Sequence, residues 1–277
     1  MTRHWLAGLL LCWAGAASAE SLPRWELGMG MGGMRMPDYR GSDESRNYFL
    51  PFPYVAYRLD WLKADRNGVR AVLFDVTEAE LNISLGASPP VRSKSNRARE
   101  GMPDIKPMLE LGPSLDFNLW RSTADRVRLD LRLPARAAIT ARINPEWAGW
   151  VFTPRLKVDF AGLGGNDVRS GWNLGLLAGP MFADRRQNAY FYSVASEYAR
   201  AGRSAYEARA GYAGMQYLAS LSRRFGDAWV GAYARYDDLR GAVFEDSPLV
   251  RRKSYVTAGF GITWTFARAT EMVEVKE

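Results

Sequence analysis

The chain has 277 residues, and its 37 Lys and Arg against 30 Asp and Glu give a formal net charge of +7. Mean hydropathy is -0.26. Beyond the N-terminal segment, no stretch approaches the roughly 18 continuous apolar residues that a transmembrane helix needs. Composition therefore excludes a helical membrane protein and leaves a strand-based or soluble fold.

The first 19 residues have the order of a secretory signal. A short basic segment at 2–4 precedes an apolar segment at 5–17, and Ala17-Ser18-Ala19 forms a small-x-small cleavage site. We expect residues 1–19 to be removed. The only cysteine, Cys12, and the only histidine, His4, would leave with them. The mature chain would then lack disulfides, His or Cys metal ligands and histidine-dependent nucleophiles, so we predict no enzyme and no cofactor.

Apolar and polar residues alternate along most of the remaining chain, as they do in strands with two different faces. We expect strands near residues 24–35, 48–60, 69–75, 79–88, 108–120, 127–140, 150–160, 172–182, 189–197, 214–224, 228–237 and 255–266. In the last of them Val256, Phe260 and Trp264 lie on one face and Thr257 and Thr263 on the other. A segment of this length suits a tilted strand that crosses a bilayer.

This pattern predicts an all-β protein, a transmembrane antiparallel β-barrel of about 12 strands after a cleaved signal peptide. Ten strands remain an alternative, because the strands near 69–75 and 79–88 are the least regular. The expected divisions are 1–19 for the signal peptide, 20–266 for the barrel and 267–277 for an acidic C-terminal tail. We expect the outer membrane as the location, with lipid and lipopolysaccharide as surroundings.

An even strand count places both termini in the periplasm. The connections at 36–47, 161–170, 198–213 and 238–253 would then be extracellular, and those at 61–68, 141–147, 184–188 and 225–227 periplasmic. One connection does not fit. Residues 89–106 are long and basic but fall on the periplasmic side, so either the strands before them are miscounted or this segment has a role of its own.

Charged residues alternate with the apolar face in several strands, which places them in the barrel interior. The candidates are Arg58, Arg128, Asp130, Arg132, Arg136, Arg155, Lys157 and Asp159. Two interpretations stand: a structural ladder with acids that include Glu110 and Asp116, or the lining of an anion path. The export signal removes nucleic acid as the partner of this basic chain.

Several segments resemble the MipA/OmpV family of outer-membrane proteins. The most specific is the block after the first strand, with Pro37, Asp38, Tyr39, Gly41, Ser42 and Asp43. Residues 51–54, 99–104, 109–113, 190–194 and 259–266 are similar as well.

The resemblance implies a non-enzymatic role. The family's named member is a scaffold between a lytic transglycosylase and a penicillin-binding protein, and other members are described as adhesins or porin-like proteins. We therefore expect a scaffold for murein enzymes. The alternatives are a small-solute channel that prefers anions, or a surface adhesin that uses the Tyr- and Arg-rich loop at 197–212.

Overall fold

The computed structural model describes residues 20–57, 62–65, 68–75, 79–167 and 170–275. The predicted signal segment, residues 1–19, lies outside this described part. The strands are β1 (Glu20–Pro23), β2 (Trp25–Pro37), β3 (Ser45–Tyr57), β4 (Leu62–Asp65), β5 (Gly68–Asp75), β6 (Ala79–Ser88), β7 (Met108–Ser122), β8 (Val127–Thr140), β9 (Trp147–Phe152), β10 (Arg155–Leu163), β11 (Trp172–Ala183), β12 (Gly211–Phe225), β13 (Ala228–Asp238), β14 (Ser254–Arg268) and β15 (Met272–Val275). One α-helix, α1 (Arg185–Tyr192), and two short 3-10 turns, η1 (Ser93–Ser95) and η2 (Ser196–Tyr198), complete the described elements.

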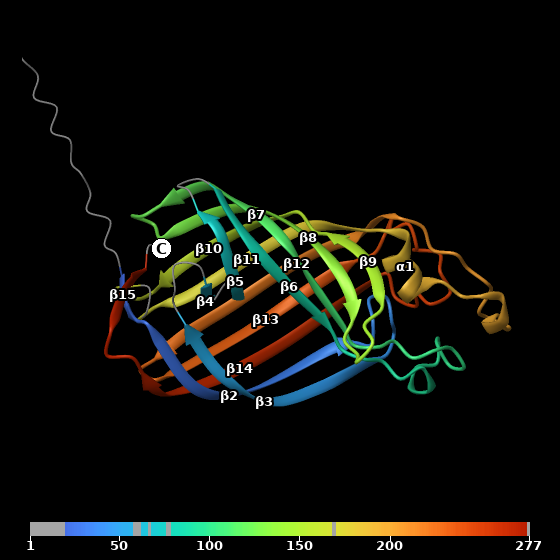
Figure 1. Cartoon of the computed structure of the whole chain (residues 1–277), viewed down its shortest axis with the longest axis horizontal. Coiled ribbons are helices and arrows are strands. Elements are labelled where there is room, and N and C mark those ends of the chain that lie inside the picture. The colour runs from blue at the N-terminus through green and yellow to red at the C-terminus, as the bar shows by residue number, and fades with distance from the viewer. Residues whose placement is uncertain (1–19, 58–61, 66–67, 76–78, 168–169, 276–277) are drawn as a thin grey trace, which may run out of the picture.

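The long strands form one antiparallel sheet that wraps into a barrel (Figure 1). Its order is β3-β2-β14-β13-β12-β11-β10-β8-β7-β6-β5-β4. β9 and β10 fill one position, because both pair with β8 and β11. The first and last strands of this order, β3 and β4, contact each other and bring the two edges of the sheet together. The prediction of an antiparallel barrel of about 12 strands is confirmed.

Side chains alternate across the wall as the sequence predicts. In β14, Phe260 and Trp264 are 60% and 61% exposed on the outer face, while Thr257 and Thr263 are buried toward the interior. Leu27, Met29 and Met31 of β2 are exposed beside them. An exposed apolar band of this kind would be unfavourable in water, and it matches the hydrocarbon layer of a bilayer. No helix within the described residues is long and apolar enough to cross a membrane.

The two ends of the barrel differ (Figure 1). One end, here called the loop end, carries the connections 38–44, 89–107, 141–146, 184–210 and 239–253. The other, here called the terminal end, carries β1, β15 and the connections 123–126, 164–171 and 226–227, each of them shorter than 89–107, 184–210 and 239–253. Outer-membrane barrels have short periplasmic turns and longer extracellular loops, so the terminal end is the periplasmic one.

One predicted strand is wrong and one strand of the barrel sheet is absent from the prediction, so the two errors cancel in the count of barrel strands. The strand predicted near 189–197 is absent, because residues 185–192 form α1. The short strand β4 was not predicted, because four residues are too few to show alternation.

Because the prediction lacks β4, every strand after it is predicted to run in the wrong direction across the membrane. The false strand near 189–197 adds one crossing, so the strands after it again have the correct direction. Four connections therefore lie on the side opposite to the prediction. Residues 89–106, 141–147 and 184–188 are at the loop end, and residues 161–170 are at the terminal end. The long basic segment 89–106 thus lies where long loops are expected.

The described part of the segment after the last barrel strand forms a further strand. β14 continues to Arg268, and β15 pairs antiparallel with β1 to form a two-stranded ribbon at the terminal end. Arg24 forms an ion pair with Glu271 next to this ribbon, with 2.9 Å between Nη1 and Oε2. Within the segment predicted as an acidic tail, residues 272–275 therefore form a strand that pairs with residues 20–23.

Candidate functional site

The interior charges predicted from the sequence come together on β7, β8 and β10. Arg128 pairs with Asp130 at 2.7 Å, Arg132 with Asp116 at 3.4 Å, Arg136 with Glu110 at 2.9 Å and Lys157 with Asp159 at 2.6 Å. Asp130 is 1% exposed and Arg136 is 6% exposed. Buried charges need such partners, because desolvation of a lone charge is expensive. Arg58, which was also predicted as an interior charge, lies outside the described residues.

Arg155 differs from the other interior cations. Among the described residues it has no ion pair, and its Nε is buried without a hydrogen-bond acceptor. In the strand register it lies directly opposite Arg132. The arrangement concentrates positive charge at one height of the barrel wall.

The family-like block, residues 37–43, lies at the loop end and connects separate loops. Pro37 ends β2, and Asp38, Tyr39 and Ser42 are buried. Asn96 Nδ2 donates hydrogen bonds to Asp38 Oδ2 at 2.9 Å and to Ser42 Oγ at 3.1 Å. These bonds join the loop 38–44 to the loop 89–107.

Further polar contacts strengthen this junction. Arg46 pairs with Asp38 at 2.6 Å, and Arg97 pairs with Asp43 and Glu44 at 3.3 and 2.8 Å. Gly41 has a φ of +92°, which suits glycine, and its carbonyl accepts bonds from the backbone N–H groups of residues 251 and 252. The block therefore holds three loops in one arrangement.

A hydrophobic cluster lies at the loop end, where loop residues pack against residues of β11, β12 and β14. The Tyr192 and Phe244 rings stack with centroids 3.7 Å apart and an interplanar angle of 10°. The Tyr39 hydroxyl donates to the Leu249 carbonyl at 2.8 Å. Tyr255 belongs to the same cluster from inside the barrel wall. We call this assembly the cap; its buried members are Tyr39, Val91, Ile105, Ala183, Tyr192, Val194, Ala208, Ala213, Leu239, Ala242, Phe244, Leu249 and Tyr255.

Polar contacts also fasten the cap to the barrel. Arg40 Nε donates to Asp237 Oδ1 at 3.1 Å, and its Nη1 donates to the Ala213 carbonyl at 2.9 Å. The Tyr192 hydroxyl donates to the Arg40 carbonyl at 3.0 Å. Burial raises the pKa of Tyr192 well above its usual value, so this hydroxyl stays neutral in the folded cap.

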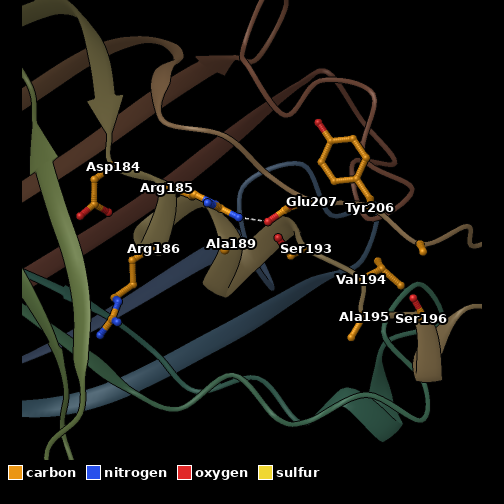
Figure 2. Close-up of a pocket in the computed structure, with 11 residues that line it drawn as sticks. Asp184, Arg185, Arg186, Ala189, Ser193, Val194, Ala195, Ser196, Tyr206 and Glu207 are labelled. Atoms are coloured by element: carbon orange, nitrogen blue, oxygen red, sulfur yellow. Dashed lines mark ion pairs between the residues drawn. The ribbon is translucent and has the colours of Figure 1, made fainter.

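The helix α1 borders an open hollow of about 1000 Å³ at the loop end (Figure 2). Arg185 and Glu207 form an ion pair across it, and Tyr206 and Ser196 stand on the side of the following loop. Part of the loop predicted as an adhesive surface, 197–212, thus lines this hollow. The sequence carries the signal for α1: Asp184 caps the helix by accepting a bond from the Gln187 N–H at 2.8 Å.

A second hollow, of about 550 Å³, lies at the terminal end. Glu26 is buried beneath it and pairs with Arg224 at 2.9 Å. Arg223 lies over the ring of Phe225, with Cζ 4.8 Å from the centroid. Met272 of β15 lines the hollow and is 50% exposed. Within the part of the chain that the structure describes, no group of three His, Cys, Asp or Glu residues is placed to hold a metal ion.

Comparison with solved structures finds distant similarities. A bacterial polysaccharide outer membrane secretin is 9% identical, with a TM-score of 0.42 over 87% of this chain and 99% of that one. The NanC porin is 11% identical, with a TM-score of 0.39 over 86% and 100%. OprG from Pseudomonas aeruginosa is 9% identical, with a TM-score of 0.23 over 89% and 95%. No curated protein is similar enough to this chain to count as a match.

The family comparison is decisive where the single structures are not. The model for MltA-interacting protein MipA matches residues 29–266, which include the block at 37–43 and run almost to the end of β14. The match spans the barrel wall and the cap together. The chain is therefore an outer-membrane protein and belongs to the MltA-interacting protein MipA family.

Proposed function

We propose that the protein is a non-enzymatic barrel that holds murein enzymes at the periplasmic face of the outer membrane. The observation that carries the proposal is the match of residues 29–266 to a family named for its interaction with MltA. The partners would be a lytic transglycosylase and a penicillin-binding protein, which the resemblance of the sequence implies.

The interior supports a platform better than a wide channel. Ion pairs line the inner wall along β7, β8 and β10. The cap gathers loop residues such as Phe244 into one hydrophobic cluster with Tyr255, whose side chain comes from the inner face of β14. Because the interior contacts and the packed loops hold the barrel in one conformation, its surface can present the same docking site to each partner.

The terminal end is the surface that periplasmic partners can reach. It presents the β1–β15 ribbon and the hollow beside Met272. Exposed Met and Arg side chains are common anchors in protein interfaces. We therefore place the docking surface on this ribbon and hollow.

Binding measurements with the folded barrel in detergent test the proposal. The lytic transglycosylase and the penicillin-binding protein would each be passed over immobilised barrel. Met272→Glu should raise the apparent Kd about tenfold or more, because it places a charge where an apolar anchor is expected. Ile143→Glu is the matched control, because Ile143 is fully exposed at the opposite end. Absence of binding by the unaltered barrel, or equal weakening by both variants, would contradict the proposal.

Arg155 favours a second candidate, a narrow channel that prefers anions. This interior cation has no ion pair among the described residues, so it could attract a mobile anion. Planar-bilayer recording separates the two candidates. Stable anion-selective steps would support the channel, and a silent, correctly folded barrel would support the platform.

A further inference from the structure

We propose that the barrel interior holds a binding site for a small oxyanion, a phosphate or a carboxylate, between Arg132 of β8 and Arg155 of β10. The site is independent of the docking surface at the terminal end. Its basis is the position of Arg155, which lies directly opposite Arg132 in the sheet and has no ion pair among the described residues, while the Nε of each arginine is buried without a hydrogen-bond acceptor.

The two arginines face each other in the sheet. Arg155 is the direct antiparallel neighbour of Arg132, and Lys157 is the neighbour of Asp130. Directly opposed residues have Cβ atoms about 4.5–5.5 Å apart, and like charges at this distance are destabilising. Lys157 has an acid, Asp130, directly opposite it, whereas Arg155 has a second cation, Arg132.

The nearest acid is already engaged. Asp116 accepts hydrogen bonds from Asn82 Nδ2 at 3.2 Å and from Ser114 Oγ at 2.5 Å. Its distance to Arg132 Nε is 3.4 Å, and that Nε is buried without a hydrogen bond. Asp116 therefore leaves the Nε of Arg132 without a hydrogen bond and forms no ion pair with Arg155.

Other acids on this wall have partners of their own, and Glu80, the register neighbour of Asp116, accepts a hydrogen bond from Asn82 Nδ2 at 3.1 Å. Glu110 accepts from Arg136 Nε at 2.9 Å, and Asp130 accepts from Arg128 Nε at 2.7 Å. Asp159 pairs with Lys157 at 2.6 Å. Asp116, Glu110, Asp130 and Asp159 each pair with one cation, and these pairs leave Arg155 without an ion pair among the described residues.

The strand on the far side of Arg155 adds no acid. The interior face of β11 carries Gly175, Leu177 and Gly179 near this height. A Cβ on Gly179 would lie 2.8 Å from the Cβ of Arg155, so a larger residue does not fit there without displacement. Arg155 thus has an arginine on one side and a bare backbone on the other.

An oxyanion suits this arrangement. Buried polar groups in native proteins are almost always hydrogen-bonded, and here two buried Nε groups lack acceptors. Phosphate and carboxylate oxygens match the forked donors of guanidinium groups. The attraction is stronger in the interior than in bulk water, because the local dielectric constant is lower.

Calorimetric titration of the folded barrel in detergent with inorganic phosphate tests the site, and acetate in a parallel titration tests the carboxylate. We expect saturable binding of at least one of the two. Arg155→Gln and Arg132→Gln should each weaken it about tenfold or more, because each removes charged hydrogen bonds. Arg251→Gln at the exposed loop end should leave it unchanged.

Arg155→Lys keeps the positive charge but removes the forked guanidinium donors. It replaces the Gln variants in the test if those variants do not fold. It should fold, as judged by heat-modifiable migration on gels, and still bind more weakly than the unaltered barrel. No saturable binding of either anion, or binding that Arg155→Gln and Arg155→Lys leave unchanged, would overturn the proposal. Loss of this site would leave enzyme docking at the terminal end intact, so the two proposals fail separately.

Discussion

Replacement of Phe244 by Ala should open the cap and leave the barrel wall folded. Phe244 is fully buried, and its ring stacks on Tyr192 with centroids 3.7 Å apart. Truncation of a buried Phe costs about 3–5 kcal/mol through lost burial and the cavity left behind. The hydrogen bonds of β11 to β14 do not involve this side chain. The loss therefore falls on the packing of loops against the barrel mouth.

The rate of trypsin cleavage after Arg203 measures this opening. In the folded cap Arg203 is 6% exposed and donates to the carbonyl groups of Ala98, Glu100 and Tyr198 at 2.7–3.0 Å. Cleavage of a transiently opened segment follows its equilibrium population when closing is fast. A loss of about 3–5 kcal/mol raises that population by roughly one hundred to several thousand times. Cleavage after Arg203 should accelerate by a similar factor.

Phe260→Ala is the matched control, because Phe260 is 60% exposed on the outer face of β14. It removes the same atoms without touching the cap, so the rate of cleavage at Arg203 should not change. If Phe244→Ala resists trypsin as well as the unaltered protein does, the aromatic cluster does not hold the cap closed. Loss of heat-modifiable migration in this variant would instead mean that the wall depends on the cap.

Three other changes test the wall and the cap. Ile262→Arg places a charge on the lipid face and should destabilise the barrel by about 2–4 kcal/mol in urea titrations in vesicles; unchanged stability would contradict the outward assignment. Asn96→Ala removes two hydrogen bonds to the loop 38–44 and should weaken the cap by about 1–3 kcal/mol, seen as faster hydrogen exchange in 89–107. Burial raises the pKa of Tyr39 and Tyr192 above the ordinary value of about 10, so the folded cap binds these protons more tightly than the open cap. Cap stability should be full below about pH 10 and fall above it, with tyrosinate absorbance rising only as the cap opens.

The wall is predictable from sequence because its physical rule is local. A residue that faces lipid must be apolar, and its neighbours along the strand face the interior, so alternation appears within a few residues. β14 and β8 show this most clearly: Phe260 and Ile139 are exposed, whereas Thr263 and Asp130 are buried. The interior charges follow from the same alternation, since Arg128, Arg132 and Arg136 are spaced by four.

Alternation alone predicts a strand over residues of α1, because it ignores the capping signal that precedes the helix. Residues 189–197 mix aromatic and small polar side chains in a pattern that a strand also allows. The better signal lies just before them, where Asp184 is followed three residues later by Gln187, close to a capping box. Helix start signals would have removed the false strand.

The cap could not be predicted from the sequence, because its contacts depend on the closed barrel. Asn96 and Asp38 are 58 residues apart and meet only because β2 and β6 end at the same side of the wall. The block at 37–43 is recognisable by its residues, but nothing local shows which loop it binds. The same limit applies to Arg155, whose lack of an acid depends on the register of three strands.

Under the proposed function, the corrected strand directions decide which segment would contact the murein enzymes. With β4 included, residues 89–106 lie at the loop end, away from the periplasm. Deletion of residues 92–102 should therefore loosen the cap, because Asn96 is lost, and leave binding of the transglycosylase to the barrel unchanged. Surface plasmon resonance with the heat-modifiable, folded deletion variant measures this. If the deletion abolished binding while Met272→Glu preserved it, the loop end would be the docking surface and the assignment of the terminal end to the periplasm would be wrong.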